Sequence, residues 1–299
     1  MVKLDKHLLY ITILLLAAFS LIELPTGTDT LLFLVTIVIV GIPHGALDHV
    51  IEFNDTRPDK LQLVKFYSIY IGLIGAVFAC WYFFPQVSFL SFIAISAYHF
   101  GQSQLFYLNL KGRFVHLYYL SWGMLLLSMI IYTNIAECMA IFDSLEWLEV
   151  SQLNSTLWLS LLIKSGTLWI TLTCLYLAKG QISMKEFGRE LLLLAILLGS
   201  SLVTNAVITF TIYFGIWHSF RSLLLTFQSI RKNVGNSISK FIKAAMPFSV
   251  AGILFLGLGY YLSFHFDLGI SIYMIFIIII STLTVPHLFV MNKLYNPLH

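Results

Sequence analysis

The sequence predicts an all-α membrane protein: a polytopic transmembrane bundle of about ten helices, with a range of eight to ten. Apolar residues make up 59% of the 299-residue chain and charged residues only 10%, and the mean hydropathy is +0.89. A soluble domain of this length carries roughly a quarter charged residues. The apolar runs are also too long and too numerous for a soluble core. We therefore expect residues 1–299 to form a single integral-membrane helical domain, and no basic patch indicates nucleic-acid binding.

Each expected span is a run of about 20 mostly apolar residues, the length that crosses the hydrocarbon core of a bilayer as a helix. Short polar or charged segments separate the runs. Between the seventh and eighth runs this segment is only two residues long, Thr204 and Asn205. The expected spans lie near 8–24, 30–49, 64–84, 87–107, 116–136, 157–178, 188–204, 206–227, 245–264 and 270–291.

The charges of the loops predict the orientation of the bundle. With the N-terminus inside, every second loop carries Lys or Arg, such as Lys111 and Arg113, while the intervening loops carry none. One of those intervening loops holds Asp143, Glu146 and Glu149 instead. Because Lys and Arg are enriched in cytoplasmic loops, both termini are expected in the cytoplasm. The expected location is the inner (cell) membrane, crossed many times.

Four histidines lie well inside expected spans, where ionisable residues are costly and mark functional sites, whereas His49 and His116 are at span ends. They are His44, His99, His218 and His287, and all four lie in helices that run from outside to inside. Counted back from the inner helix ends at 1.5 Å per residue, they lie roughly 6–14 Å deep. Packing histidines with unrelated roles have no reason to share a depth, so the pattern favours one shared site.

Neutral imidazole is a ligand for iron, zinc and copper, and a metal would offset the burial of these polar rings. His44 and His49 belong to the segment Gly-Ile-Pro-His-Gly-Ala-Leu-Asp-His, in which Asp48 lies four residues after His44. If that segment is helical, Asp48 shares a face with His44 and is either a ligand or the acceptor that orients one.

Aromatic residues next to these histidines are candidates for the lining of a channel that takes a long apolar substrate. The same residues are common in membrane helices that have no such channel, and the sequence leaves both interpretations open. The four candidates are Tyr98, Phe100, Phe214 and Trp217.

Three motifs give the sequence a resemblance to a known family. Pro-His-Gly-Ala-Leu-Asp-His, Tyr-His-Phe-Gly-Gln-Ser-Gln and Trp-His-Ser-Phe-Arg begin at residues 43, 98 and 217. They resemble the motifs of the Brp/Blh family of membrane β-carotene 15,15′-dioxygenases, from the second expected span to the tenth. The resemblance implies a non-haem Fe(II) enzyme that uses dioxygen to cleave β-carotene, or a related carotenoid, at its central double bond. The product would be retinal, often supplied to a microbial rhodopsin.

The resemblance also implies which residues bind the metal. Carried over by motif, His44, His99 and His218 are iron ligands, and no further catalytic side chain is required. The family has a second histidine one turn after the position of His218, where this sequence has Ser222. We expect His287 to supply the fourth nitrogen, because its helix runs in the same direction and Pro286 can redirect its side chain. Asp48, His49 and Ser222 are then expected as groups that orient the ligands or as alternative ligands.

Two other function classes remain as alternatives. A di-iron membrane desaturase or hydroxylase would use several histidine boxes, whereas only His44 and His49 form one here. A non-enzymatic transporter or proton pathway would need charged residues spread through the bilayer, whereas the expected intramembrane histidines cluster on one side.

Overall fold

A computed structural model of the chain describes residues 2–21, 25–54, 58–234 and 237–295. The all-α prediction is confirmed, because every regular element in these ranges is a helix. Residues 22–24 of the first expected span lie outside the described part of the chain. The helices fall into two compact units, and the expectation of one domain over residues 1–299 stays a prediction.

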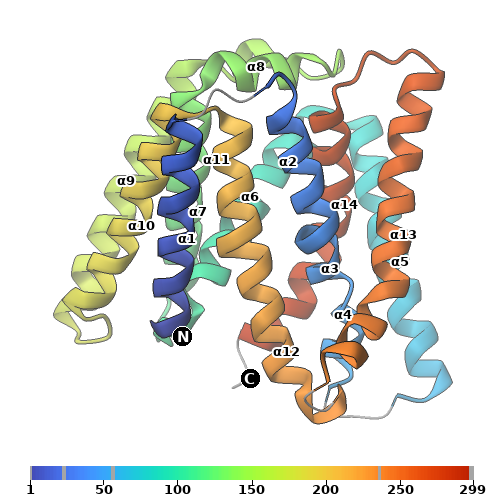
Figure 1. The fold of residues 1–299 in the computed structure, drawn as a ribbon, viewed down its shortest axis with the longest axis horizontal. Helices are drawn as coiled ribbons and strands as arrows, with labels where there is room; N and C mark the ends of the chain where they lie inside the picture. Colours follow the sequence, from blue (N-terminus) through green and yellow to red (C-terminus); the bar gives the residue numbers. More distant parts are fainter. Residues whose placement is uncertain (1, 22–24, 55–57, 235–236, 296–299) are drawn as a thin grey trace. The chain divides into compact units, whose positions relative to one another are not determined.

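Unit 1 comprises residues 1–37, 96–139 and 151–221. In it α7 packs against α9 and α10, and α11 packs against α2, as Figure 1 also shows. Its helices are α1 (Val2–Leu21), α2 (Thr28–Thr36), the second half of α6 (Pro85–Leu105), η2 (Phe106–Leu108), α7 (Val115–Thr133), most of α8 (Ile135–Asp143), α9 (Ser155–Ala178), α10 (Met184–Val203), α11 (Ala206–Ile212) and the π-helix η4 (Tyr213–Phe220).

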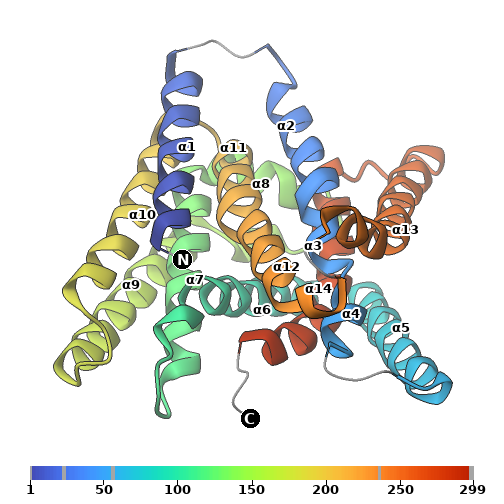
Figure 2. The same ribbon diagram turned by 60° about the horizontal axis from the view of Figure 1, so that its bottom comes forward.

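Unit 2 comprises residues 38–95, 140–150 and 222–299. Its long helix α14 packs against α5, α4 and α13, an arrangement that Figure 2 shows from a second side. Its elements are the π-helix η1 (Ile37–Gly41), α3 (Ile42–Gly45), α4 (Asp48–Glu52), α5 (Lys60–Phe83), the first half of α6, α12 (Arg221–Val234), α13 (Ile238–His265) and α14 (Ile272–Tyr295), while the short η3 (Val150–Gln152) begins at the unit boundary.

The helices are those of a membrane protein. Among the described residues, six helical segments are long and apolar enough to cross a bilayer, and each coincides with an expected span. In α5 no residue of the most apolar window is buried, and side chains such as Leu61 and Ile71 are largely exposed. Apolar surface of this kind is stable only against lipid or a partner. The six segments are Thr28–Glu52, Lys60–Phe83, Val115–Thr133, Ser155–Ala178, Ile238–His265 and Ile272–Tyr295.

The remaining expected spans correspond to helices that are shorter or less apolar, so the total of ten stays a prediction. These are α1, α6, α10 and the continuous run of α11, η4 and α12. Two features were not expected from the sequence. The expected outer loop after α7 contains α8, and two stretches of π-helix, η1 and η4, interrupt the second and eighth expected spans.

Two glycines bring α6 and α7 into backbone contact in unit 1. A Cβ at Gly101 would lie 1.8 Å from the carbonyl oxygen of Tyr119, and one at Gly123 would lie 1.8 Å from that of Ala97. Such close approach requires glycine, as at other tightly packed membrane helix pairs. Because Ala97 and Gly101 flank His99, these contacts also fix the position of that histidine.

Replacing Gly123 with alanine is expected to force α6 and α7 apart and to destabilise the protein by about 3 kcal/mol or more, since overpacking against backbone cannot relax. Thermal unfolding in detergent and the yield of folded protein measure the effect. Gly199→Ala on α10 is the matched control, because no described atom lies within 4 Å of its added Cβ. Equal stability of the two variants would contradict the close packing.

Candidate metal centre

Unit 2 holds two of the expected histidine ligands side by side. His44 lies on α3 and His287 on α14, and both are buried, with 6% and 5% of their surface exposed. Their ring centroids are 4.9 Å apart with the ring planes nearly perpendicular. A ligand nitrogen of one ring lies within 4.8 Å of a ligand nitrogen of the other. This spacing fits two nitrogens that share one metal ion.

The local backbone explains how His44 reaches this position. The π-helix η1 ends at Gly41, and the next turn, α3, ends in a turn at Ala46 and Leu47 before α4 begins at Asp48. π-Helical segments often occur at functional sites, where they redirect side chains. His44 Nδ1 donates a hydrogen bond to the carbonyl oxygen of Gly41. His44 and Asp48 therefore lie on separate helices rather than on one continuous helical face.

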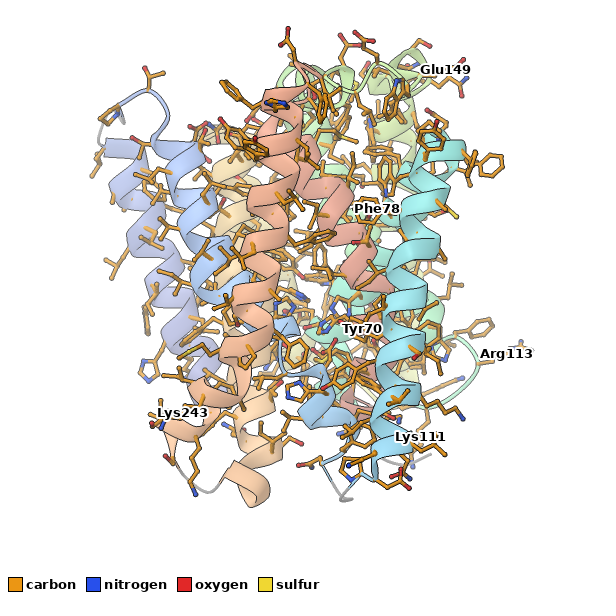
Figure 3. All side chains as sticks on the ribbon, turned by 90° about the vertical axis from the view of Figure 1, so that its right-hand side faces the viewer. Tyr70, Phe78, Lys111, Arg113, Glu149 and Lys243 are labelled. Atoms are coloured by element: carbon orange, nitrogen blue, oxygen red, sulfur yellow. The ribbon has the colours of Figure 1, made fainter. Side chains whose placement is uncertain are left out.

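Asp48 connects three helices of unit 2. Its Oδ1 accepts a hydrogen bond from His287 Nδ1 at 2.7 Å, and its Oδ2 accepts one from the hydroxyl of Tyr70 at 2.9 Å. Asp48 is 3% exposed, so this carboxylate is held in the interior by its partners. The side chains thus link α14, α4 and α5, and Figure 3 labels Tyr70 on α5.

These hydrogen bonds determine where the protons of both rings lie. A carbonyl oxygen only accepts, so His44 Nδ1 carries a proton, and the carboxylate of Asp48 likewise orients a proton on His287 Nδ1. In neutral imidazole the other nitrogen, Nε2, then has the lone pair. Histidine ligands in metal sites have this same arrangement, with the far nitrogen donating to a carboxylate or backbone carbonyl.

Unit 1 holds the other two expected ligands, also as a pair. His99 lies on α6 and His218 within η4, and each is 2% exposed. Their ring centroids are 4.8 Å apart, with an angle of 80° between the planes. As in unit 2, one member of the pair lies in or directly after a π-helix.

Two of the four expected channel residues lie against His218. The ring of Phe100 is 4.8 Å from that of His218 and the ring of Phe214 is 5.6 Å away, and both phenylalanines are buried. The other two face different partners, since the Tyr98 hydroxyl bonds His116 Nδ1 at 2.9 Å and Trp217 Nε1 donates to Thr12 Oγ1 at 3.0 Å.

A buried polar network joins the ends of the two histidine motifs in unit 1. Arg221 donates to the side-chain oxygen of Gln104 at 3.1 Å and to its backbone oxygen at 3.3 Å. Gln104 in turn donates to Glu190, which also accepts from the hydroxyl of Tyr107. The network holds α6, α10 and the end of η4 together. Glu190 also pairs with its neighbour Arg189, but it was not expected from the sequence, because Gln104 and Tyr107 are more than 80 residues away.

The two remaining candidate residues have partners of their own in unit 2. His49 is half-buried, and its ring lies 4.7 Å from that of Phe248 on α13. Ser222 is buried, and its hydroxyl lies 3.2 Å from that of Tyr295. Pro286 lies inside α14, which continues through it to Tyr295 without interruption.

Replacing Asp48 with alanine is expected to weaken metal binding by about 10- to 100-fold, the usual effect of removing the acceptor that orients a histidine ligand. Titration of the purified apoprotein with Fe(II) measures the affinity. Asp48→Asn is the matched control, because its amide oxygen can still accept from His287 Nδ1, and it should retain a larger share of the affinity. Equal affinity of the alanine variant and the wild type would remove Asp48 from the site.

Comparisons with known proteins agree with these motifs. A family model described as "Beta-carotene 15,15'-dioxygenase" matches residues 35–295. A protein of that name from uncultured marine bacterium 66A03 is 40% identical over 72 residues, which cover 23% of this chain and 26% of the relative. The chain thus aligns with only about a quarter of that relative's length, and no solved structure matches it. Because the family model covers most of the chain, including all four buried histidines, the protein belongs to the β-carotene 15,15′-dioxygenase family.

Proposed function

We propose that the protein is a non-haem iron dioxygenase that cleaves β-carotene, or a related carotenoid, at the central double bond to give two molecules of retinal. Membership of the family supports carotenoid cleavage. The observation that supports a bound metal is the presence of two buried histidine pairs, one in each unit, within a membrane protein. The proposed ligands are His44, His99, His218 and His287, and all four bind one Fe(II).

The chemistry of the donors fits iron. Neutral imidazole nitrogens are suitable ligands for Fe(II), and in unit 2 the Nδ1 hydrogen bonds direct Nε2 of His44 and His287 as the donor atoms. When bound, Fe(II) supplies the reaction with dioxygen, which no amino-acid side chain provides.

The side chains around the histidines contribute orientation and exclusion of water. Asp48, held by Tyr70, keeps His287 in one tautomer and one direction. Phe100 and Phe214 cover one side of His218 with apolar surface, which favours a polyene over water. No side chain is assigned as a general acid or base, because dioxygen addition across a carbon–carbon double bond leaves no proton to transfer.

Expression in cells that make β-carotene tests the proposal. The wild type is expected to bleach the cells and to yield retinal, identified by chromatography and mass, with one iron per purified chain. Retinal formation without iron would contradict the metal assignment, and iron without retinal would contradict the reaction. Two irons per chain would favour the desaturase or hydroxylase class. Cells that keep their β-carotene colour, together with a purified protein that contains no iron, would favour a transporter or proton pathway.

The orientation in the membrane and the fate of the product are part of the same proposal. Unit 2 has Lys243 near one end and Glu149 near the other, as Figure 3 shows. Lys and Arg favour the cytoplasmic side, so we place the end with Lys243, and both termini, in the cytoplasm of a cell with an inner membrane. Retinal released into the bilayer would be available to a microbial rhodopsin.

A further inference from the structure

Unit 1 contains a buried carboxylate in a helix of a membrane protein. Glu190 lies on α10 and is 1% exposed. Burial of a carboxylate is costly unless the group is paired and hydrogen-bonded. Its Oε1 accepts from the hydroxyl of Tyr107 at 2.9 Å and pairs with Arg189 at 3.3 Å, while its Oε2 accepts from Gln104 at 2.9 Å. An ionisable group in such a position is a functional candidate.

The carboxylate determines the orientation of the Gln104 side chain. Because a carboxylate only accepts, the amide nitrogen of Gln104 points to Glu190 and the amide oxygen points to Arg221, whose Nη1 donates to it at 3.1 Å. The reversed amide would place its N–H groups against a guanidinium, which can only donate. Glu190 therefore acts on Arg221 through Gln104.

Arg221 in turn fixes the C-terminal end of the π-helix η4. It directly follows Phe220, its backbone N–H donates to the carbonyl oxygen of His218, and its side chain is 1% exposed. At the other end, the helical run that contains η4 begins at Ala206, whose backbone N–H donates to Glu137 at 2.8 Å. Both ends are thus held by other helices of unit 1. The number of residues between two fixed points determines how tightly a helix is wound.

The π-helical winding determines the direction of the His218 side chain. A π-helix bonds residue i to residue i+5, is rare, and occurs frequently at functional sites. If its C-terminal end were released, η4 could return to the commoner α-helical winding. Loss of the extra residue would turn His218 about the helix axis by about 100°, because 3.6 residues make one α-helical turn. Its ring, which lies 4.8 Å from that of His99, would then face away from it.

The helices α6 and η4 meet at two levels. Phe100 and Gln104 are one turn apart on α6, and they contact His218 and Arg221, which are three residues apart. The contact between Gln104 and Arg221 is the polar one, so it fixes the register of the two helices more specifically than the contact between rings. This register is the one in which the rings of His99 and His218 meet.

We propose that Glu190 is a positioning residue of the iron site, which holds η4 in its π-helical form through Gln104 and Arg221 and thereby keeps His218 beside His99. The link to iron rests on the proposed function, whereas the hold on η4 is a property of the protein without metal. Since Glu190 acts through Gln104, moving the carboxylate from position 190 to position 104 should preserve the effect.

A double substitution tests this dependence. Glu190→Gln with Gln104→Glu exchanges the two side chains, so that the new carboxylate accepts directly from Arg221 and the new amide donates to that carboxylate. Glu190→Ala removes the acceptor, and Glu190→Gln alone takes its place in the comparison if the alanine variant does not fold. Glu186→Gln is the matched control, because it removes a carboxylate one turn earlier on α10, where Glu186 belongs to the capping box of the helix.

Amide hydrogen exchange of the purified full-length apoprotein in detergent measures the hold on η4. Exchange in residues 213–220 is expected to rise about tenfold or more in Glu190→Ala, the effect of losing a hydrogen bond to a charged group. The double variant and Glu186→Gln should exchange at the wild-type rate, and α9 of the same unit should be unchanged in every variant. An unchanged rate in η4, or an equal rise in α9, would overturn the proposal, because Glu190 would then either not hold η4 or stabilise the whole unit.

Titration of the same proteins with Co(II), which also binds imidazole ligands, measures the consequence for the metal site. The visible spectrum of Co(II) reports the number and geometry of its ligands. Glu190→Ala should bind Co(II) about tenfold more weakly, by the same loss of one hydrogen bond, and with an altered spectrum, and the double variant should restore both. Wild-type affinity and spectrum in Glu190→Ala would overturn the positioning role. A wild type without metal or without retinal would instead overturn the proposed function, and the exchange rates would still decide whether Glu190 holds η4.

Discussion

Replacement of His99 or His218 with alanine is expected to remove the iron and to lower retinal formation by more than about 100-fold, beyond the effect of losing a group that only orients a ligand. Both rings are buried and lie together, so each variant removes one of two neighbouring nitrogen donors of the proposed iron site. Alanine is well tolerated in membrane helices, so both variants should fold and insert. Iron per chain and retinal output in carotene-producing cells are the two measurements.

His116→Ala is the matched control for these variants. His116 belongs to the same unit and lies in the first turn of α7, but it is exposed and its Nδ1 is bonded to the hydroxyl of Tyr98. Its removal should leave iron content and retinal output near the wild-type level. If either His99→Ala or His218→Ala kept both wild-type values while folded, that histidine would not be an iron ligand.

The helices and the histidine candidates could be predicted because both depend on local sequence. A run of apolar residues is sufficient to predict a spanning helix, and a histidine inside such a run is unusual regardless of what surrounds it. The structure brings His44 together with His287 and His99 together with His218 within their units. Matched depth predicted a shared level in the membrane, but it carried no information on which pairs would meet.

The partners of the histidines could not be predicted, because they depend on contacts between distant parts of the chain. Asp48 would share a helical face with His44 if the segment between them were continuous helix, but the chain turns at Ala46 and Leu47 and Asp48 bonds His287, 239 residues away. Hydropathy also gives the same signal for α-helix and π-helix, so the π-helices η1 and η4 could not be predicted from the sequence. The polar ends of the motifs, Gln104 and Arg221, were the available signal for the Glu190 network.

Replacing His287 with alanine is expected to strip the iron, since His287 is proposed to supply the nitrogen that Ser222 does not. Its ring lies beside that of His44, and its Nδ1 is bonded to Asp48 in the manner of a metal-bound histidine. The competing possibility is a three-histidine site in which His287 is only a packed polar residue. A hydrogen bond to a buried carboxylate would satisfy such a residue equally well, so the two possibilities differ in metal content and not in this contact.

Iron per chain in two variants decides between them. With four ligands, His287→Ala should retain little iron, and adding Ser222→His to it should restore part of the iron, because the resemblance to the family implies a ligand at that position. Since Ser222 is buried against Tyr295, the Ser222→His single variant is needed as a control for folding and should keep its iron. With three ligands, His287→Ala keeps its iron and the second substitution adds nothing. Retained iron in a folded His287→Ala protein would therefore reduce the proposed site to His44, His99 and His218.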